Sequence, residues 1–368
     1  MMKKIVSFTV FVLLVVMIFD ACQKDPTEPE IPIVPTTPDN DTVSVNLDSV
    51  PYTNLSQYRF FTGDMKNNTP NDGVIQYQPA SGLFTDYAHK KRFVWVPAGL
   101  KGTYVADNNI IEFPVGTALI KTFYYDHVQP DNVTKIIETR VMIRKSNEWI
   151  FAEYVWNEDQ TEATLSMNGS TVSLDWDEDG TPKSTIYRIP SETECLICHK
   201  SNNLPIPIGI KPQNLNNDFT YPSGRVNQLQ YFISKGILEN NLPSNIVSTI
   251  DYHDTTQTLK LRLRSYLDIN CGHCHQENSH CDYRPIRLAF SETTDPAHLG
   301  QCVTPDDMFD PSLPNIIFPG NYNKSMMYFR LNSTDENNRM PLLGRTIVDE
   351  AGLKLVRDYI SSISNCTD

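Results

Sequence analysis

The pattern of hydrophobic and polar residues divides the chain into a part that predicts strands and a part that predicts helices. Between residues 50 and 190, short runs rich in β-branched and aromatic residues end at Gly, Pro, Asn or Asp, as strands joined by turns do. In the run RVMIRK, Val141 and Ile143 alternate with Arg140 and Met142, as on a strand with one buried face. The pattern therefore predicts an N-terminal antiparallel β domain.

Helical periodicity begins after residue 190. The run VNQLQYFISKGI places Leu229 and Phe232 on one face. The run DTTQTLKLRLRSYLDIN also has helical spacing, with Asp254 or Thr255 as its N-cap, and VDEAGLKLVRDYISSI has Asp349 as its N-cap. We therefore expect an α+β multidomain protein in which the β domain is followed by an α-helical part.

The first residues predict an export signal followed by a lipid attachment site. An apolar run from Ile5 to Phe19 follows a short basic start, and Ala21 stands before Cys22. The run is too short for a membrane span, which favours a cleaved signal over residues 1–21. The small residue before cysteine resembles a bacterial lipoprotein box, which implies lipidation of Cys22; the alternative is an uncleaved anchor. Both place the body outside the cytoplasm and tied to a membrane.

A proline-rich segment follows the lipid attachment site. Proline recurs every third residue from Pro26 to Pro38, which matches the three-residue turn of polyproline II. Residues 22–49 are therefore expected to form a tether that holds the body away from the bilayer.

Length and charge narrow the class of protein. With 368 residues the chain can form two or three domains, each with its own core. The formal net charge is −13. Because nucleic acid and anionic membrane surfaces would repel such a protein, neither is expected as a partner of its surface.

Two short stretches share one arrangement of cysteine and histidine. In ECLICHK and NCGHCHQ, two cysteines stand two residues apart and a histidine follows directly: Cys195, Cys198, His199 and Cys271, Cys274, His275. This spacing presents two thiols one helical turn apart to the two vinyl groups of haem, and the adjoining imidazole can then bind iron. The two stretches predict two covalently bound haem c groups with iron ligands at His199 and His275.

Other uses of these cysteines remain open. Two C-x-x-C pairs could supply four thiolates to a structural zinc ion, although this does not explain a histidine at the same place twice. A redox-active disulfide usually stands at a helix start in a βαβ setting, which the sequence does not predict. Haem attachment accounts for more of the pattern than either alternative.

The sequence also predicts a ligand for the second iron. The run NNRMPLLG places Met340 in a loop between the second motif and the last predicted helix. A thioether opposite histidine raises the reduction potential of haem iron. A helix that leads into the motif, a loop bearing methionine and a closing helix predict an α-helical cytochrome c-like domain over residues 251–368.

The first motif, in segment 191–250, has no comparable ligand nearby. No Met or His occurs between Lys200 and Tyr252. The ligand opposite His199 could come from farther along the chain or from a lysine, and the candidates are Lys211, His253, His280, His298, Met308, Met326 and Met327. An iron without a sixth protein ligand could bind a small molecule, whereas a ligated iron would only relay electrons.

Three cysteines lie outside the two motifs. In an oxidising compartment, Cys281 and Cys302 could pair and close the loop after the second motif, which would leave Cys366 spare.

The chain resembles a family of bacterial dihaem c-type cytochromes. The resemblance covers roughly residues 50–363 and rests on runs that include GLFTDYAHKKRFVWVPAG, FPVGTALIKTFYY, PSETECLICHK, RSYLDINCGHCH and RMPLLG. The C-terminal part is also similar to cytochrome c modules of secreted quinoprotein sugar dehydrogenases. The resemblance implies haem on both C-x-x-C-H motifs and Met340 as a distal ligand.

Together these patterns predict a lipid-anchored dihaem c-type cytochrome that transfers electrons outside the cytoplasm between an unidentified donor and an unidentified acceptor. The alternative is a dihaem enzyme, peroxidase-like or associated with a dehydrogenase, whose first haem is open. A third reading is an adhesion or binding module in which the motifs are structural.

Overall fold

The computed structural model describes residues 42–368 of the chain. The predicted signal over residues 1–21, the lipidation of Cys22 and most of the predicted tether lie outside these residues. At the end of the tether segment, Val43, Val45 and Leu47 pack partly buried against the core of the sheet.

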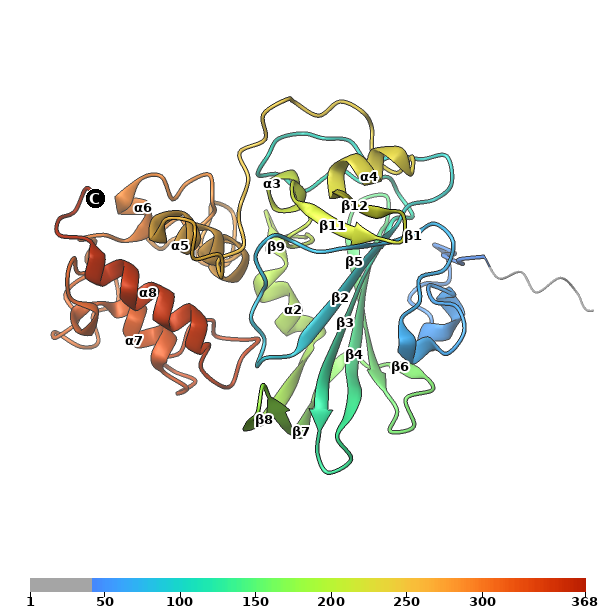
Figure 1. The fold of residues 1–368 in the computed structure, drawn as a ribbon, viewed down its shortest axis with the longest axis horizontal. Helices are drawn as coiled ribbons and strands as arrows, with labels where there is room; N and C mark the ends of the chain where they lie inside the picture. The colour runs from blue at the N-terminus through green and yellow to red at the C-terminus, as the bar shows by residue number, and fades with distance from the viewer. Residues whose placement is uncertain (1–41) are drawn as a thin grey trace, which may run out of the picture. The chain divides into compact units, whose positions relative to one another are not determined.

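One antiparallel sheet of eight strands dominates the described residues (Figure 1). Its strands are β1 (Val74–Tyr77), β2 (His89–Trp95), β3 (Ala118–Val128), β4 (Val133–Arg144), β5 (Trp149–Trp156), β6 (Ala163–Leu165), β7 (Asn168–Glu178) and β8 (Thr181–Ser191). The first six strands follow one another in chain order, and the β7–β8 hairpin joins the sheet through β3.

Both faces of the sheet are covered. On one face, Phe93, Ile120 and Val141 pack in a core that includes the short 3-10 helix η1 (Leu55–Tyr58). On the other face, Met142 is only 8% exposed. The prediction of a half-buried strand around Val141 was therefore wrong, because the face that carries polar residues is covered by segments from later in the chain.

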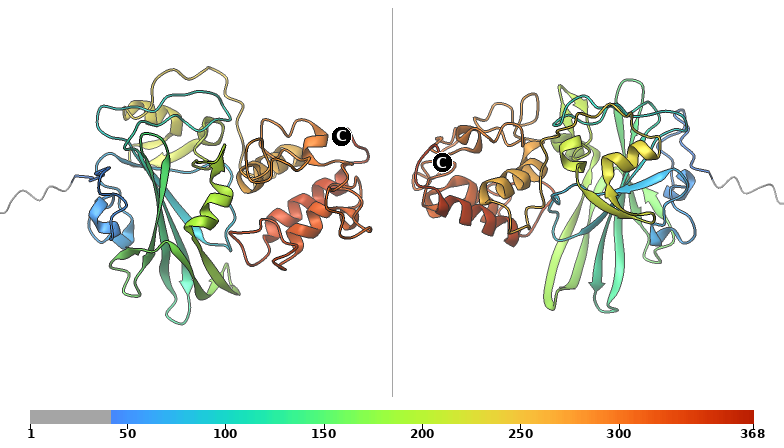
Figure 2. Two further views of the ribbon diagram at one scale, coloured as in Figure 1. Left: turned by 180° about the vertical axis from the view of Figure 1, so that it is seen from behind. Right: turned by 45° about the horizontal axis from the view of Figure 1, so that its top comes forward.

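Seven α-helices of four to 13 residues lie within the described chain: α2 (Glu192–Cys198), α3 (Pro212–Leu215), α4 (Gln228–Ser234), α5 (Leu259–Leu267), α6 (Pro296–Leu299), α7 (Met326–Asn332) and α8 (Glu350–Ser362). The remaining short helical elements are the 3-10 turns η2 (Met65–Asn67) and η4 (Tyr322–Lys324) and the π-helical turn η3 (Asp268–Gly272). Two short strand pairs complete the list: β9 (Lys200–Ser201) with β10 (Leu204–Pro205), and β11 (Asp218–Tyr221) with β12 (Gly224–Asn227). Helices α5, α7 and α8 share one core, and α2 lies between the sheet and these helices (Figure 1, Figure 2).

Side-chain caps mark where several helices begin. Asp349 accepts a hydrogen bond from the amide of Gly352 at 2.9 Å and caps α8, as the sequence predicted. Helix α5 begins later than expected, because Thr258 caps it by accepting from the amide of Leu261, and neither Asp254 nor Thr255 does.

The predicted fold class is wrong. The sequence predicted a multidomain protein with an α-helical cytochrome c-like domain over residues 251–368, but residues 42–368 form one unit built mainly on the antiparallel sheet. Long irregular segments separate the short helices of the C-terminal part. Proline, which cannot donate the amide hydrogen bond of a helix interior, recurs in these segments at Pro285, Pro305, Pro311, Pro314 and Pro319.

Glycine is required at one position of α8. A Cβ atom added at Gly352 would overlap the hydroxyl group of Tyr266 and a carboxylate oxygen of Asp349, which are hydrogen-bonded to each other at 3.0 Å. We expect Gly352→Ala to destabilise the protein by about 1–3 kcal/mol, since overpacking outweighs the gain in helix propensity. Urea unfolding measures the change.

The exposed neighbour provides the control for Gly352. Ala351 lies on the solvent side of the same helix, so Ala351→Gly should cost only about 1 kcal/mol through helix propensity. A Gly352→Ala variant more stable than the wild type would show that the packing against Tyr266 does not require glycine.

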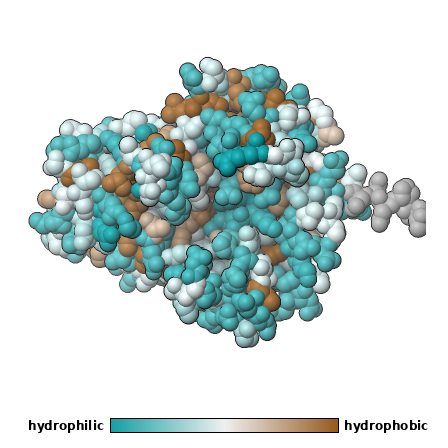
Figure 3. Space-filling model, viewed as in Figure 1, coloured by the Kyte–Doolittle hydropathy of each residue, from teal (hydrophilic) through white to brown (hydrophobic). Residues whose placement is uncertain are grey.

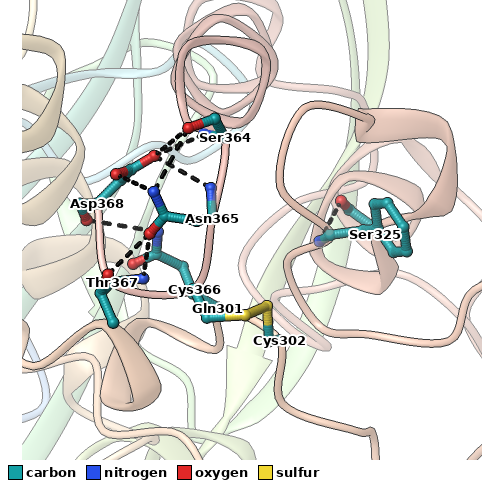
Figure 4. The surroundings of a disulfide bond; sticks show 9 residues. Gln301, Cys302, Ser325, Ser364, Asn365, Cys366, Thr367 and Asp368 are labelled. Atoms are coloured by element: carbon teal, nitrogen blue, oxygen red, sulfur yellow. Dashed lines mark hydrogen bonds between the residues drawn. A yellow bond between two sulfur atoms is a disulfide. The ribbon is translucent and has the colours of Figure 1, made fainter.

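The disulfide differs from the predicted pair. Cys302 is bonded to Cys366 (Figure 4). Cys281 is a buried free cysteine. The suggestion that Cys281 pairs with Cys302 was therefore wrong. The bond closes a loop of 64 residues and ties the last residues to the segment after α6; there, Asp368 accepts hydrogen bonds from Ser364.

The surface is mixed in character. Figure 3 shows hydrophobic residues in small groups on the face in view, with hydrophilic residues around them. Within residues 42–368, no helix has the length and apolar composition needed to cross a membrane.

Candidate functional site

The first motif is carried by α2, which continues from strand β8. Ser191 caps this helix in a reciprocal arrangement with Glu194, whose side chain accepts from the amide of Ser191 at 2.9 Å. The helix ends at Cys198, and His199 is its C-cap. The two cysteines therefore lie one turn apart on a fixed helix, with the histidine at the end that faces the sheet.

A large cavity opens beside this motif. It has about 1300 Å³ of empty space, its open mouth included, and Cys195, Cys198 and His199 line it. The opposite walls come from the sheet, where Leu119 and Met142 are neighbours on β3 and β4.

The imidazole of His199 is oriented for metal binding. Its Nδ1 lies 2.9 Å from the carbonyl oxygen of Ile206, and because a carbonyl only accepts, Nδ1 carries the hydrogen. Burial lowers the pKa of His199 to about 3, so the ring is neutral and its Nε2 has a free lone pair. Phe151 packs edge-on against the ring at 5.2 Å. A backbone partner on the second nitrogen is typical of histidines that bind metals.

The second motif follows α5 through the turn η3. A second cavity of about 760 Å³, also open to solvent, is lined by Cys271, His275 and Met340. The sequence placed these three residues together as attachment site, proximal ligand and distal ligand, and the fold brings them to one cavity. Burial lowers the pKa of His275 to about 4, and its buried Nδ1 has no hydrogen-bond partner within residues 42–368.

A buried arginine holds the loop that carries Met340. Arg345 is 3% exposed and donates from Nε to the carbonyl oxygen of Met340 at 2.9 Å. Its Nη2 donates to the carbonyl oxygens of Arg330, Leu331 and Ser333. Sequence reasoning did not single out Arg345, because nothing local distinguishes it from a surface arginine.

The two motifs touch each other. The ligand atoms of Cys198, His273 and Cys274 lie within 4.8 Å of one another. His273 stands between the two cysteines of the second motif, is 9% exposed and lines the first cavity. The second cysteines of the two motifs therefore lie side by side, and both line a smaller space between the motifs.

This contact bears on the zinc alternative. A Cys₄ site needs all four sulfur atoms around one point, but within the described chain the cluster holds only Cys198 and Cys274 together with His273. Burial raises the pKa of the other two thiols, Cys195 and Cys271, to about 12, which opposes the thiolate form that zinc requires. The arrangement fits two separate attachment sites better than one four-cysteine zinc site.

Basic side chains line the first cavity: Arg92, Lys121, Arg140 and Arg188. Arg140 donates to both carboxylate oxygens of Glu138, at 2.5 and 3.0 Å, and Arg188 pairs with Glu194. Tyr187 donates a further hydrogen bond to Glu138 at 2.6 Å. The sequence did not predict this lining, since the residues come from four strands: β2, β3, β4 and β8.

Glu153 lies on β5 opposite Arg140 and is 3% exposed. Its carboxylate oxygens have no hydrogen-bond donor within residues 42–368. Burial and the neighbouring Glu138 carboxylate raise the pKa of Glu153 well above its usual range, although Arg140 opposes this. Because the folded state holds this proton more tightly, Glu153 costs no stability below about pH 4.3 and a growing amount above it.

Glu153→Gln should therefore stabilise the protein at pH 8 and have little effect at pH 4. Each unit by which the pKa is raised corresponds to about 1.4 kcal/mol, so we expect a gain above this value at pH 8. Urea unfolding at both pH values measures it, with Glu148→Gln, at an exposed position, as the control. Equal changes in the free energy of unfolding for Glu153→Gln and Glu148→Gln at both pH values would contradict the destabilising effect of burying the Glu153 carboxylate.

The candidates for the ligand opposite His199 lie elsewhere. Met326 and Met327 line the second cavity, and His280 lines the space between the motifs. Lys211 pairs with Asp268 at 3.8 Å, and Met308 is 44% exposed. The remaining two are His253, which stacks on Tyr252, and His298, which lies beside Glu292. None of these residues lines the first cavity as described, whereas Met142, which the sequence analysis did not consider, does.

Comparisons of the chain with protein-family models, with curated proteins and with solved structures found no match.

Proposed function

We propose that this chain is an exported, membrane-tethered electron-transfer protein that binds two haem c groups. The observation that carries the proposal is the contact between two C-x-x-C-H motifs that each line a cavity of their own. The sulfur atoms of Cys198 and Cys274 lie within 4.8 Å of each other. Because electron tunnelling falls steeply with distance, two redox groups attached at these sulfurs would exchange electrons rapidly.

The residues that would hold the two groups follow from the cavities they line. The first site has the thiols of Cys195 and Cys198 and the Nε2 of His199, and the second has Cys271, Cys274 and His275 with Met340 as the opposite ligand. Bound haem iron would supply a one-electron couple between ferric and ferrous states.

The protein contributes orientation and a low-polarity environment. The Ile206 carbonyl oxygen and the Phe151 ring fix the imidazole plane of His199. Leu267, Ile286, Leu288 and Leu331 line the second cavity with apolar surface. Such surroundings disfavour the additional positive charge of a ferric iron and therefore raise its reduction potential.

Export and lipidation at Cys22 complete the proposal. Haem c is attached outside the bacterial cytoplasm, so the predicted signal and the two motifs support each other. The anchor would keep the protein at a membrane, where it would exchange electrons with a redox donor and an acceptor. The acidic net charge of −13 disfavours nucleic acid as a partner.

Haem counting tests the proposal directly. The protein is produced in a host with cytochrome maturation machinery, and pyridine haemochrome spectra and intact mass are measured. We expect two haems in the wild type, one in the Cys195→Ala/Cys198→Ala variant and one in the Cys271→Ala/Cys274→Ala variant. Cys281→Ala, which removes a cysteine outside both motifs, should retain two. A wild-type protein that contains zinc or lacks covalent haem would refute the proposal.

One observation favours the enzyme alternative. The first cavity is larger than the second, and none of the histidine or methionine candidates from the sequence reaches it. Within its lining, the side chains able to ligate iron include Met142, His273, Lys121 and Tyr77. Two low-spin ferric irons that do not respond to cyanide or peroxide would exclude an open site, whereas a high-spin signal would favour the enzyme.

A further inference from the structure

A row of basic residues crosses the face of the sheet that lines the first cavity. Arg92 on β2 stands opposite Lys121 on β3, and Lys121 stands opposite Arg140 on β4. Directly opposed residues point to the same face of a sheet, so the three side chains form one row. All three line the first cavity.

Two of these cations lack an acidic partner. Arg92 is 8% exposed, and neither it nor Lys121 forms an ion pair or donates a hydrogen bond within residues 42–368. The Nζ of Lys121 lies 4.7 Å from the centre of the Phe123 ring, a contact that leaves its charge uncompensated. By contrast, Arg140 is paired with Glu138.

The acidic groups near the row do not pair with Arg92 or Lys121. Glu153, opposite Arg140 on β5, has a raised pKa and no hydrogen-bond donor within residues 42–368. Glu138 binds Arg140 and Tyr187, and Glu194 binds Arg188 and the amide of Ser191. A buried charge without a partner destabilises the folded state. Burial lowers the pKa of Lys121 well below its usual range, and the charges of Arg92 and Arg140 lower it further. A negative group of a ligand beside Arg92 and Lys121 would stabilise the charged form of both side chains.

The row also lies on the appropriate side of the cavity. The charges of Arg140 and Glu153 act on the Cys195 thiol, which places the attachment edge near β4 and β5. Arg92 lies three strands away from Glu153, a distance of about 14 Å at the usual strand spacing. In haem c, the thioether edge and the propionate edge lie on opposite sides of the ring.

We propose that Arg92 and Lys121 bind the two propionate groups of the haem attached at Cys195 and Cys198. This inference rests on the proposed function. It gives the β-sheet a role in the redox site: the sheet supplies the counter-charges of the first haem and thereby helps to set its reduction potential.

The test is a redox titration of the haem-loaded protein. Arg92→Met removes a cation next to the first haem, and the loss of this positive charge favours the ferric state. The midpoint potential of one haem should therefore fall while that of the other stays at its wild-type value. The propionate bending bands in the resonance Raman spectrum should shift as well. Arg92→Lys keeps the charge and should recover most of the wild-type potential. The Cys271→Ala/Cys274→Ala form, which retains only the first haem, should show the same fall.

The adjacent lysine provides a matched control. Lys91 follows Lys90 and precedes Arg92 on β2, points to the opposite face and donates to the carbonyl oxygen of Asn67. Lys91→Met loses the same charge and should leave both potentials and the Raman bands at wild-type values. Equal effects of Arg92→Met and Lys91→Met would overturn the inference.

Two further outcomes separate the possibilities. If added formate shifts the wild-type potential in a concentration-dependent way without changing the spin state of the iron, and Arg92→Met abolishes that shift, a free anion occupies the row and the propionate assignment is wrong. If the wild type carries no covalent haem, the proposed function itself fails. Two haems with potentials that do not respond to Arg92→Met would overturn this inference alone.

Discussion

Replacing Met340 by alanine is expected to lower the reduction potential of one haem and to leave the other at its wild-type value. Met340 lines the cavity of Cys271 and His275, and the hydrogen bond from Arg345 to its carbonyl oxygen holds its loop in place. A thioether ligand stabilises ferrous iron, and axial ligands set haem potentials over a range of about 0.8 V. We therefore expect a fall on the order of 0.1–0.3 V, measured by a spectroelectrochemical titration.

A methionine elsewhere on the surface provides the control for Met340. Met308 is 44% exposed and does not line the second cavity as described, so Met308→Ala should leave both potentials unchanged. The ferric spectrum of Met340→Ala should also lose the charge-transfer band of a methionine-ligated haem. If that band and both potentials persist, another residue ligates the second iron, and Met326 and Met327 are the nearest alternatives in the cavity lining.

Removing the disulfide is expected to have the largest effect on stability. The bond between Cys302 and Cys366 spans 64 residues. A closed loop of this length restricts the unfolded chain and stabilises the fold by about 4 kcal/mol. The Cys302→Ser/Cys366→Ser variant should therefore unfold at a clearly lower urea concentration than the wild type. Added reductant should lower the urea midpoint of the wild type to that of the variant.

Cys281 distinguishes the observed pair from the one that the sequence suggested. In the structure Cys281 is free, so reductant should lower the urea midpoint of Cys281→Ala as it does that of the wild type. Loss of that sensitivity in Cys281→Ala would mean that Cys281 takes part in the bond. The bond also holds residues 363–368 against the residues that follow α6.

Local features explain what could be read without the fold. The spacing of each C-x-x-C-H motif is a property of one helical turn, so the identity of the candidate residues did not depend on distant contacts. Asp349 was recognisable as a helix cap because capping involves residues only three apart. Met340 was found from its order relative to the second motif and the last helix, and it does line the cavity of Cys271 and His275.

Other features depend on residues that are far apart in the chain. The disulfide partner of Cys302 and the contact between Cys198 and Cys274 are set by how segments meet in space, which spacing along the chain does not encode. The helical cytochrome-like domain was overestimated because apolar spacing in the C-terminal part predicts helices without showing how much irregular chain separates them.

The sequence by itself predicted which residues would attach and ligate haem, and it determined the cap of α8 at Asp349 and which runs alternate as strands. These features arise from interactions within a few residues. Only the tertiary structure decided that Arg92, Lys121 and Met142 face the first cavity, and that the two motifs meet. Alternation places residues on opposite faces of a strand, but what covers each face depends on the packing of segments more than fifty residues away.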